Sequence, residues 1–250
     1  MSPGRTLSLR RRRGLVAGLA GLAGLGAAAA ATSGAALRVM VNEVAPYSMR
    51  RGEQIVGMHP EMVRAIFEQA EEPIVLNTAL YARVSRALRD EVADVVVALE
   101  GPDLDAQGLR LGALHPVRML ILPRKGLVLN QVAQLRGLTL GVARGAFYGD
   151  SINNDAEIKK FPLPDPFTGV RMLALGRLDA VISTDYLLTH ALRQEAVQRE
   201  AFGAALVYGD AAYALYGRRD LPPERVARLR AAVARLQRQG RLEALVRPYE

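Results

Sequence analysis

The sequence predicts a mixed α/β fold made of two blocks, with the second block inserted into the first. Short β-forming runs alternate with segments of helical periodicity through residues 37–99, and this alternation resumes after residue 117. The final segment, residues 222–245, has helical spacing and needs an apolar surface to cover, so we expect it to return to the first block. A chain of 250 residues is long enough for two lobes, each with its own core.

The first block has a β-α-β-α-β order. Residues 37–41 are a β-type run, and residues 43–57 indicate a loop or a hairpin. From Met58 the apolar residues follow helical spacing, and Pro73 marks the end of this helix. The further expected elements are a strand at residues 74–76, a helix at 81–88 and a buried parallel strand at 92–99.

The second block follows a segment that predicts no regular structure. Residues 100–116 contain three glycines and two prolines, so we expect a long functional loop there. The further expected elements are strands at 117–122, 138–142, 178–182 and 206–216, and helices starting near 149–151 and covering 170–175, 186–200 and 222–245, the last interrupted at Gly240. We expect one lobe from residues 37–120 with 207–250, and a second from residues 121–206.

Composition excludes several function classes. The chain has no cysteine, which excludes a disulfide scaffold, a thiol nucleophile, thiolate metal sites and a lipid-anchored cysteine. Its net charge of +8 owes much to five arginines in residues 1–36, where no acidic residue occurs. The other 28 basic residues nearly balance the 25 acidic ones, so no nucleic-acid partner is expected.

The first 36 residues have the three parts of an export signal. The arginines at 10–13 precede an uncharged, Gly- and Ala-rich run at 14–31, and small residues at 32–36 suit a signal peptidase. A membrane anchor is the alternative, but the run is only weakly apolar. Residues 11–15 also fit a relaxed twin-arginine pattern, which leaves that route and the general secretory route both open. Either route predicts a periplasmic protein.

Four segments occur in a fixed order along residues 37–250. A first strand is followed by the aromatic loop at 45–48 and by Gly57, which leads into a helix. An "Asp-hydrophobic" strand begins at Asp94. Residues 135–145 read Leu-Arg-Gly-Leu-Thr-Leu-Gly-Val-Ala-Arg-Gly, and residues 175–181 read Leu-Gly-Arg-Leu-Asp-Ala-Val. In this order the chain resembles the family 3 solute-binding proteins, the periplasmic receptors of ABC-type uptake systems for polar amino acids and similar solutes.

The resemblance implies a type II periplasmic-binding-protein fold, in which two α/β lobes are joined by two crossover strands. It implies a solute bound in the cleft between the lobes, and a permease or a sensor in the inner membrane as partner. Strand ends and helix N-termini from both lobes offer backbone groups to a polar ligand in such a cleft, and closure excludes water from it. We expect a monomer without a cofactor.

The site residues expected from the resemblance lie after strand ends and at a helix start. Tyr81 matches the aromatic lid over the ligand, and Tyr47 lies in the aromatic loop, where it could instead pack inside the lobe. Thr184 and Asp185 follow the strand at 178–182, near the family's amino-group acceptor. The remaining ligand-binding candidates are Glu43, Glu100, Gly145, Ala146, Phe147 and Tyr148.

The ligand loop departs from the family pattern. Amino-acid receptors of this family carry hydroxyl residues and then an arginine that binds the ligand's α-carboxylate through a bidentate fork. Here the hydroxyl positions are Ala98, Leu99 and Gly101, and the arginine position falls at residues 106–107, with Arg110 as a substitute if the loop is longer. We therefore expect standard α-amino acids to be poor ligands.

Other chemistries find little support. His59, His115 and His190 are far apart in sequence and have no paired spacing, so no metal site is expected. Periplasmic dehydratases of cyclic hydroxy acids are similar in sequence to this family, which leaves an enzyme as the second reading, with Glu43, Glu100 or Asp185 as general acid. A receptor that signals to a membrane partner is the third.

Overall fold

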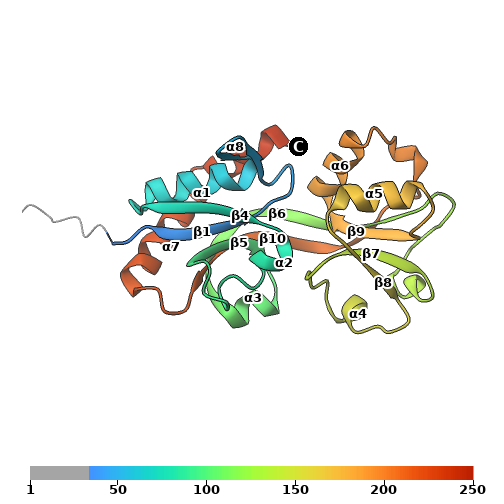
Figure 1. The fold of residues 1–250 in the computed structure, drawn as a ribbon, viewed down its shortest axis with the longest axis horizontal. Helices are drawn as coiled ribbons and strands as arrows, with labels where there is room; N and C mark the ends of the chain where they lie inside the picture. Colours follow the sequence, from blue (N-terminus) through green and yellow to red (C-terminus); the bar gives the residue numbers. More distant parts are fainter. Residues whose placement is uncertain (1–33, 250) are drawn as a thin grey trace, which may run out of the picture. The chain divides into compact units, whose positions relative to one another are not determined.

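The computed structural model describes residues 34–249 (Figure 1), so residues 1–33, the greater part of the predicted export signal, lie outside the described residues. The elements up to the first crossover are β1 (Leu37–Asn42), β2 (Met49–Arg51), β3 (Gln54–Val56), α1 (Met58–Gln69), β4 (Ile74–Ala79), α2 (Tyr81–Val84), β5 (Val95–Leu99) and α3 (Pro102–Gln107). The elements from the first crossover onward are β6 (Gly108–Pro123), β7 (Thr139–Ala143), α4 (Asp150–Asn153), β8 (Lys159–Leu163), α5 (Pro166–Ala174), β9 (Ala180–Thr184), α6 (Asp185–Gln194), β10 (Leu206–Arg218), α7 (Pro223–Arg238) and α8 (Arg241–Val246).

One eight-stranded sheet runs through these residues in the order β4-β1-β5-β10-β6-β9-β7-β8. At one end β1 pairs in parallel with β4 and β5, and at the other end β7 pairs in parallel with β8 and β9. Strands β6 and β10 lie between the two groups, antiparallel to each other (Figure 1). We call β1–β5 with α1–α3, α7 and α8 the first lobe, and β7–β9 with α4–α6 the second lobe.

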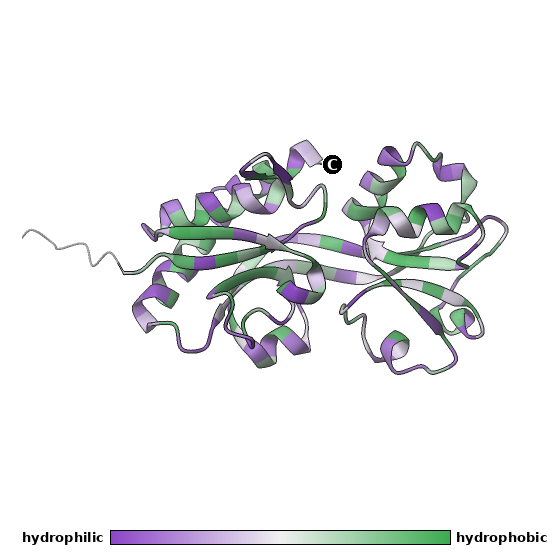
Figure 2. Cartoon of the chain, viewed as in Figure 1, coloured by the Kyte–Doolittle hydropathy of each residue, from purple (hydrophilic) through white to green (hydrophobic). Residues whose placement is uncertain are grey.

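Strand β5 is apolar because both faces of the sheet are covered there. In β5, Val95 and Val97 pack into the cluster under α1, α7 and α8, whereas Val96 and Ala98 pack into a second cluster on the opposite face. Figure 2 shows hydrophobic colour along β5, whereas hydrophilic and hydrophobic segments alternate along the helices. This arrangement explains the uninterrupted apolar run in the sequence.

Each lobe uses an aspartate at the start of an apolar strand to hold the neighbouring parallel strand. The Asp94 carboxylate accepts hydrogen bonds from the Arg38 backbone N–H at 2.9 Å and from the Arg38 guanidinium at 3.0 and 2.7 Å. The guanidinium lowers the pKa of Asp94 below its usual value. In the second lobe, Asp179 accepts from the Thr139 N–H at 2.8 Å and from Arg124 Nε at 3.0 Å. Asp94 of the "Asp-hydrophobic" strand and Asp179 of the segment 175–181 therefore hold neighbouring strands together.

The expected loop at residues 100–116 is wrong. The structure has α3 at Pro102–Gln107 and the start of β6 at Gly108. Two of the three glycines that suggested a loop, Gly108 and Gly112, lie in β6, where there is no room for a side chain. A Cβ at Gly108 would lie 2.6 Å from Leu88 Cδ1, and a Cβ at Gly112 would lie 2.6 Å from Val233 Cγ1.

Several other boundaries differ from the sequence prediction. The helix expected at 81–88 is regular only in α2, and the strand expected from residue 92 begins at Val95. Strand β8 was not predicted because four of its five residues are exposed and it contains Pro162, which an edge strand tolerates. The C-terminal break at Gly240 is confirmed, because that residue has φ +66° between α7 and α8.

Replacing Gly112 tests the close approach of α7 to β6. Gly112→Ala should lower the free energy of unfolding by about 1–3 kcal/mol, because its Cβ overlaps the Val233 side chain. Gly209→Ala in β10 is the matched control, since a Cβ there meets nothing within 4 Å. Urea denaturation measures both, and equal stability of the two variants would contradict the assigned packing.

Candidate functional site

The carboxyl ends of strands from both lobes meet at one place. Strands β1 and β5 of the first lobe end at Asn42 and Leu99, and β7 and β9 of the second lobe end at Ala143 and Thr184. All four residues line the same cavity, together with Tyr213 of the crossover strand β10. This is where ligands bind in open parallel sheets, because loops and helix starts follow the strand ends.

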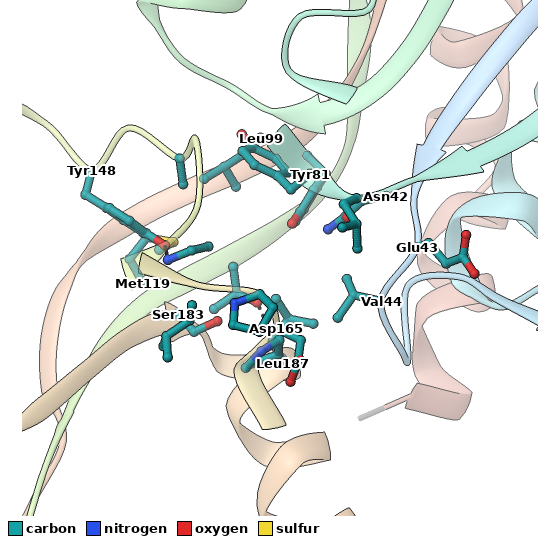
Figure 3. Close-up of a pocket in the computed structure, with 18 residues that line it drawn as sticks. Asn42, Glu43, Val44, Tyr81, Leu99, Met119, Tyr148, Asp165, Ser183 and Leu187 are labelled. Atoms are coloured by element: carbon teal, nitrogen blue, oxygen red, sulfur yellow. Dashed lines mark hydrogen bonds between the residues drawn. The ribbon is translucent and has the colours of Figure 1, made fainter. Parts of the chain in front are cut away.

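The cavity is small and mostly apolar. Its volume is about 70 Å³, and Figure 3 shows the side chains around it. We call it the deep cavity. It is lined by Asn42, Glu43, Val44, Leu80, Tyr81, Leu99, Met119, Ala143, Ala146, Tyr148, Leu163, Pro164, Asp165, Pro166, Ser183, Thr184, Leu187 and Tyr213.

Two buried polar side chains reach the deep cavity from opposite lobes without a partner. Asn42 is 6% exposed and Ser183 is 8% exposed. Among the described residues, neither the Asn42 amide nor the Ser183 hydroxyl has a hydrogen-bond partner. In Figure 3 they lie on opposite sides of the cavity. The buried side-chain atoms without a partner among the described residues are His59 Nδ1 and Gln107 Oε1, so the polar atoms of Asn42 and Ser183 are accessible from the cavity and available to a bound molecule.

The deep cavity is lined by two carboxylates and, within the described residues, by no arginine or lysine. The carboxylate of Glu43 accepts a hydrogen bond from Thr78 Oγ1 at 2.6 Å and lies 3.9 Å from Arg50 Nε, and Figure 3 shows it directed away from the cavity. Asp165 caps α5, where it accepts hydrogen bonds from Thr168 N at 2.7 Å and Thr168 Oγ1 at 3.0 Å. No ion pair of Asp165 is found in residues 34–249.

Three tyrosines line the cavity from three parts of the fold: Tyr81 at the start of α2, Tyr148 before α4 and Tyr213 in β10. The Tyr148 hydroxyl accepts a hydrogen bond from the Ala143 N–H at 3.0 Å, which fixes the loop after β7. Burial raises the pKa of Tyr148 to about 12 and raises the pKa of Tyr81 and Tyr213 above the ordinary value. All three are therefore neutral at physiological pH.

A second, larger cavity of about 630 Å³ shares Tyr81 and Leu99 with the deep cavity, and we call it the outer cavity. The predicted residues Glu100, Gly145 and Phe147 line it, and the Glu100 carboxylate accepts from Arg110 Nε at 2.8 Å. The lobes touch beside it, because a Cβ at Gly145, which has φ +76°, would lie 3.1 Å from Ala82 Cα.

The two remaining predicted residues lie behind the deep cavity. Tyr47 is fully buried, and its hydroxyl is 2.7 Å from Thr184 Oγ1, a hydrogen bond that joins the two lobes. Asp185 is the first residue of α6 and lies 3.4 Å from Arg118 Nε. The structure thus brings Tyr81, Tyr148, Ala146 and Thr184 together at the deep cavity, and places Tyr47 and Asp185 outside it.

A buried ring cluster packs behind Tyr213. The Tyr47 ring stacks on His59 with centroids 4.5 Å apart, and Tyr213 stacks on His115 at 5.3 Å. The Nε2 atoms of the two histidines are 3.0 Å apart. Sequence spacing gave no signal for this pair, because His59 lies on α1 and His115 on β6, and only the fold brings them together.

The contacts of the pair assign both tautomers. His115 Nδ1 lies 3.2 Å from the Pro116 carbonyl oxygen, which can only accept, so Nδ1 carries the proton. His115 Nε2 must then accept from His59 Nε2–H, which leaves His59 Nδ1 buried without a partner. Both rings are neutral. Burial lowers the pKa of His59 well below its ordinary value and that of His115 to about 4.

Comparison with solved structures identifies the fold. The sensor domain of a histidine kinase with similarity to periplasmic binding proteins matches with a TM-score of 0.76 at 17% identity, over 87% of this chain and 96% of that one. An ancestral arginine-binding protein bound to arginine matches with a TM-score of 0.73 at 17% identity, over 87% and 99%. This chain has the type II periplasmic-binding-protein fold.

A third structure extends the comparison. The substrate-binding protein AbpA of an amino-acid ABC transporter from Streptococcus pneumoniae, bound to L-arginine, matches with a TM-score of 0.70 at 19% identity, over 85% of this chain and 93% of that one. No family model and no curated protein matches the sequence. In residues 34–249 the structure contains no helix that is long and apolar enough to span a membrane. The periplasmic-binding-protein fold is thus shared with transporter receptors and with sensor domains alike.

Sequence reasoning missed most of the residues that line the deep cavity, among them the polar residues Asn42, Asp165 and Ser183 and the aromatic residue Tyr213. Asn42 directly follows the strand predicted at 37–41, and this position at a strand end could have found it. Asp165 gave no such signal, since strand β8 before it was not predicted.

Acidification should destabilise the fold through the two histidines. The folded chain holds His115 neutral down to about pH 4, whereas the unfolded chain protonates it near 6.5, so the free energy of unfolding falls as pH drops through this window. His115 alone accounts for about 3 kcal/mol, and His59 acts in the same direction.

Urea denaturation at several pH values measures this effect. In His115→Gln the fall between pH 6.5 and 4 should be smaller than in the wild type, because glutamine does not titrate. A stability difference between the two proteins that stays constant over this window would contradict the prediction.

Proposed function

We propose that this chain captures a small polar solute between its two lobes and passes it to an ABC-type permease or reports it to a membrane sensor. The observation that carries this proposal is the deep cavity, to which Asn42 of the first lobe and Ser183 of the second lobe both present polar groups without a partner among the described residues. A solute bound there would contact both lobes and hold them together.

The fold comparison supports both a transport and a signalling role. AbpA is named as the substrate-binding protein of an amino-acid ABC transporter, the ancestral protein is named for binding arginine, and the third structure is the sensor domain of a histidine kinase. An export signal at residues 1–36 would place the chain in the periplasm, where either partner could meet it.

The walls of the deep cavity support the expectation that α-amino acids bind poorly. An α-carboxylate needs a cationic partner, and none of the described lining residues is an arginine or a lysine. Arg110, the substitute considered from the sequence, is absent from the lining of both cavities and binds Glu100 instead. Three other arginines, Arg86, Arg89 and Arg144, line the outer cavity but not the deep cavity. Without the bidentate contact between an arginine and the α-carboxylate, an amino acid should bind roughly ten- to a hundredfold more weakly than it binds a receptor that has this contact.

The dehydratase alternative gains no specific support. It requires a general acid facing the substrate. Of the three candidate acids, Glu43 is directed away from the deep cavity, Glu100 binds Arg110, and Asp185 lies beside Arg118. The structural neighbours are binding proteins and sensor domains. We therefore propose a non-enzymatic receptor.

Filling the deep cavity tests the proposal. In a thermal-shift panel of amino acids, polyols and amines, one class should raise the wild-type melting temperature, by about 5–10 °C at a hundredfold excess over Kd. The same compound should leave Ala146→Phe unchanged, because the added ring occupies the cavity. Phe147→Ala, in the outer cavity, is the matched control and should respond like the wild type. Equal stabilisation of Ala146→Phe would refute the assigned site.

Within this panel the twenty standard amino acids should have little effect. Micromolar binding of any of them, lost in Arg110→Ala, would show that the carboxylate clamp exists and that Arg110 provides it.

A further inference from the structure

The deep cavity combines aromatic walls with a single available negative charge. Tyr81, Tyr148 and Tyr213 line it from the first lobe, the second lobe and the crossover strand. Tyr213 is held rigidly, because its ring packs against His115, His59 and Tyr47 on the side of the ring cluster. The faces of neutral phenol rings attract cations, and several rings around one cavity are typical of sites for ammonium groups.

Asp165 gives this space its charge. Among the described residues its carboxylate accepts hydrogen bonds only from the N–H and hydroxyl of Thr168, and no basic side chain forms an ion pair with it. The guanidinium of Arg171 lies one hydrogen bond further away, because it donates to Thr168 Oγ1 at 3.2 Å. The other acid of the lining, Glu43, lies beside Arg50 and outside the space. A cation in the deep cavity would therefore gain from Asp165, whereas an anion would be repelled.

The size of the cavity limits the cation. A water molecule needs roughly 10–15 Å³ of such volume, so the deep cavity of about 70 Å³ holds about five water-sized groups. This space suits a compact alkylammonium group with a short polar tail. Asn42 and Ser183 supply hydrogen-bond partners for the tail.

We infer that the solute is a small alkylammonium cation of about the size of tetramethylammonium or choline, bound among the three tyrosines with Asp165 as its counter-ion. This inference rests on the proposed function, because it names the ligand class of the same site. It goes beyond that function by assigning a charge sign, a size and a counter-ion.

Calorimetry on the purified wild-type chain tests the charge directly. Choline and its neutral isostere, in which a quaternary carbon replaces the nitrogen, have nearly the same shape. Choline should bind at least roughly tenfold more tightly, because only the cation interacts with Asp165 and the ring faces. Equal affinity for the two compounds would overturn the inference, and this comparison needs no variant.

Two variants test the assigned residues. Asp165→Asn keeps an N-cap acceptor for α5 but loses the charge, so choline affinity should fall roughly tenfold while the melting temperature of the free protein changes little. Asp103→Asn, which removes an acid of the outer cavity, is the matched control and should leave choline affinity unchanged. A larger loss in Asp103→Asn than in Asp165→Asn would overturn the counter-ion assignment.

The outcomes separate this inference from the proposed function. If tetramethylammonium and choline both fail to bind at millimolar concentration, the ammonium inference is wrong. The proposed function then still holds if another panel compound stabilises the wild type but not Ala146→Phe. If no compound does so, both fail.

Discussion

The pairing of β6 with β10 is the constraint on which the rest of the structure depends. The two strands are hydrogen-bonded from Leu206↔Ile121 at one end to Arg218↔Gly108 at the other. Strand β10 also pairs with β5, and β6 also pairs with β9, so both lobes belong to one sheet. The lobes can therefore move relative to each other only as far as this pair bends or twists. The register shifts along the pair are natural places for such bending, because a bulge locally interrupts the ladder of hydrogen bonds.

The same constraint determines what the cleft can recognise. Because parallel strands in each lobe end toward the other lobe, Asn42 and Tyr81 reach the space from one side and Ser183 and Asp165 from the other. The Tyr47–Thr184 hydrogen bond joins the lobes directly behind this space. Amino-acid receptors with this fold would place an arginine here. In this chain the lining is aromatic and apolar with one available carboxylate. This lining is the basis for the proposed cationic ligand.

Much of the fold could be predicted from the sequence, because buried parallel strands leave uninterrupted apolar runs such as Val95–Leu99. Strand β8 left no such signal, since it lies at the sheet edge with four exposed residues. The segment after Leu99 was misread because Gly108 and Gly112 resemble loop residues, although they are required where β6 packs closely against Leu88, β10 and α7. At the site, the resemblance indicated Tyr81 and Tyr148, which lie in matching motifs. The His59–His115 pair could not be predicted, because its two residues meet only after the sheet and α1 have formed.

The central claim is that solute binding in the deep cavity draws the two lobes into one closed arrangement. The distance between one spin label on each lobe tests it most directly, and the absence of cysteine makes two introduced thiols unique. Exposed positions are available at Glu68 of α1 and Thr189 of α6, as Glu68→Cys and Thr189→Cys. With a solute that stabilises the wild type but not Ala146→Phe, the distance distribution should narrow to one population. A distribution that is unchanged at saturating solute would contradict the account.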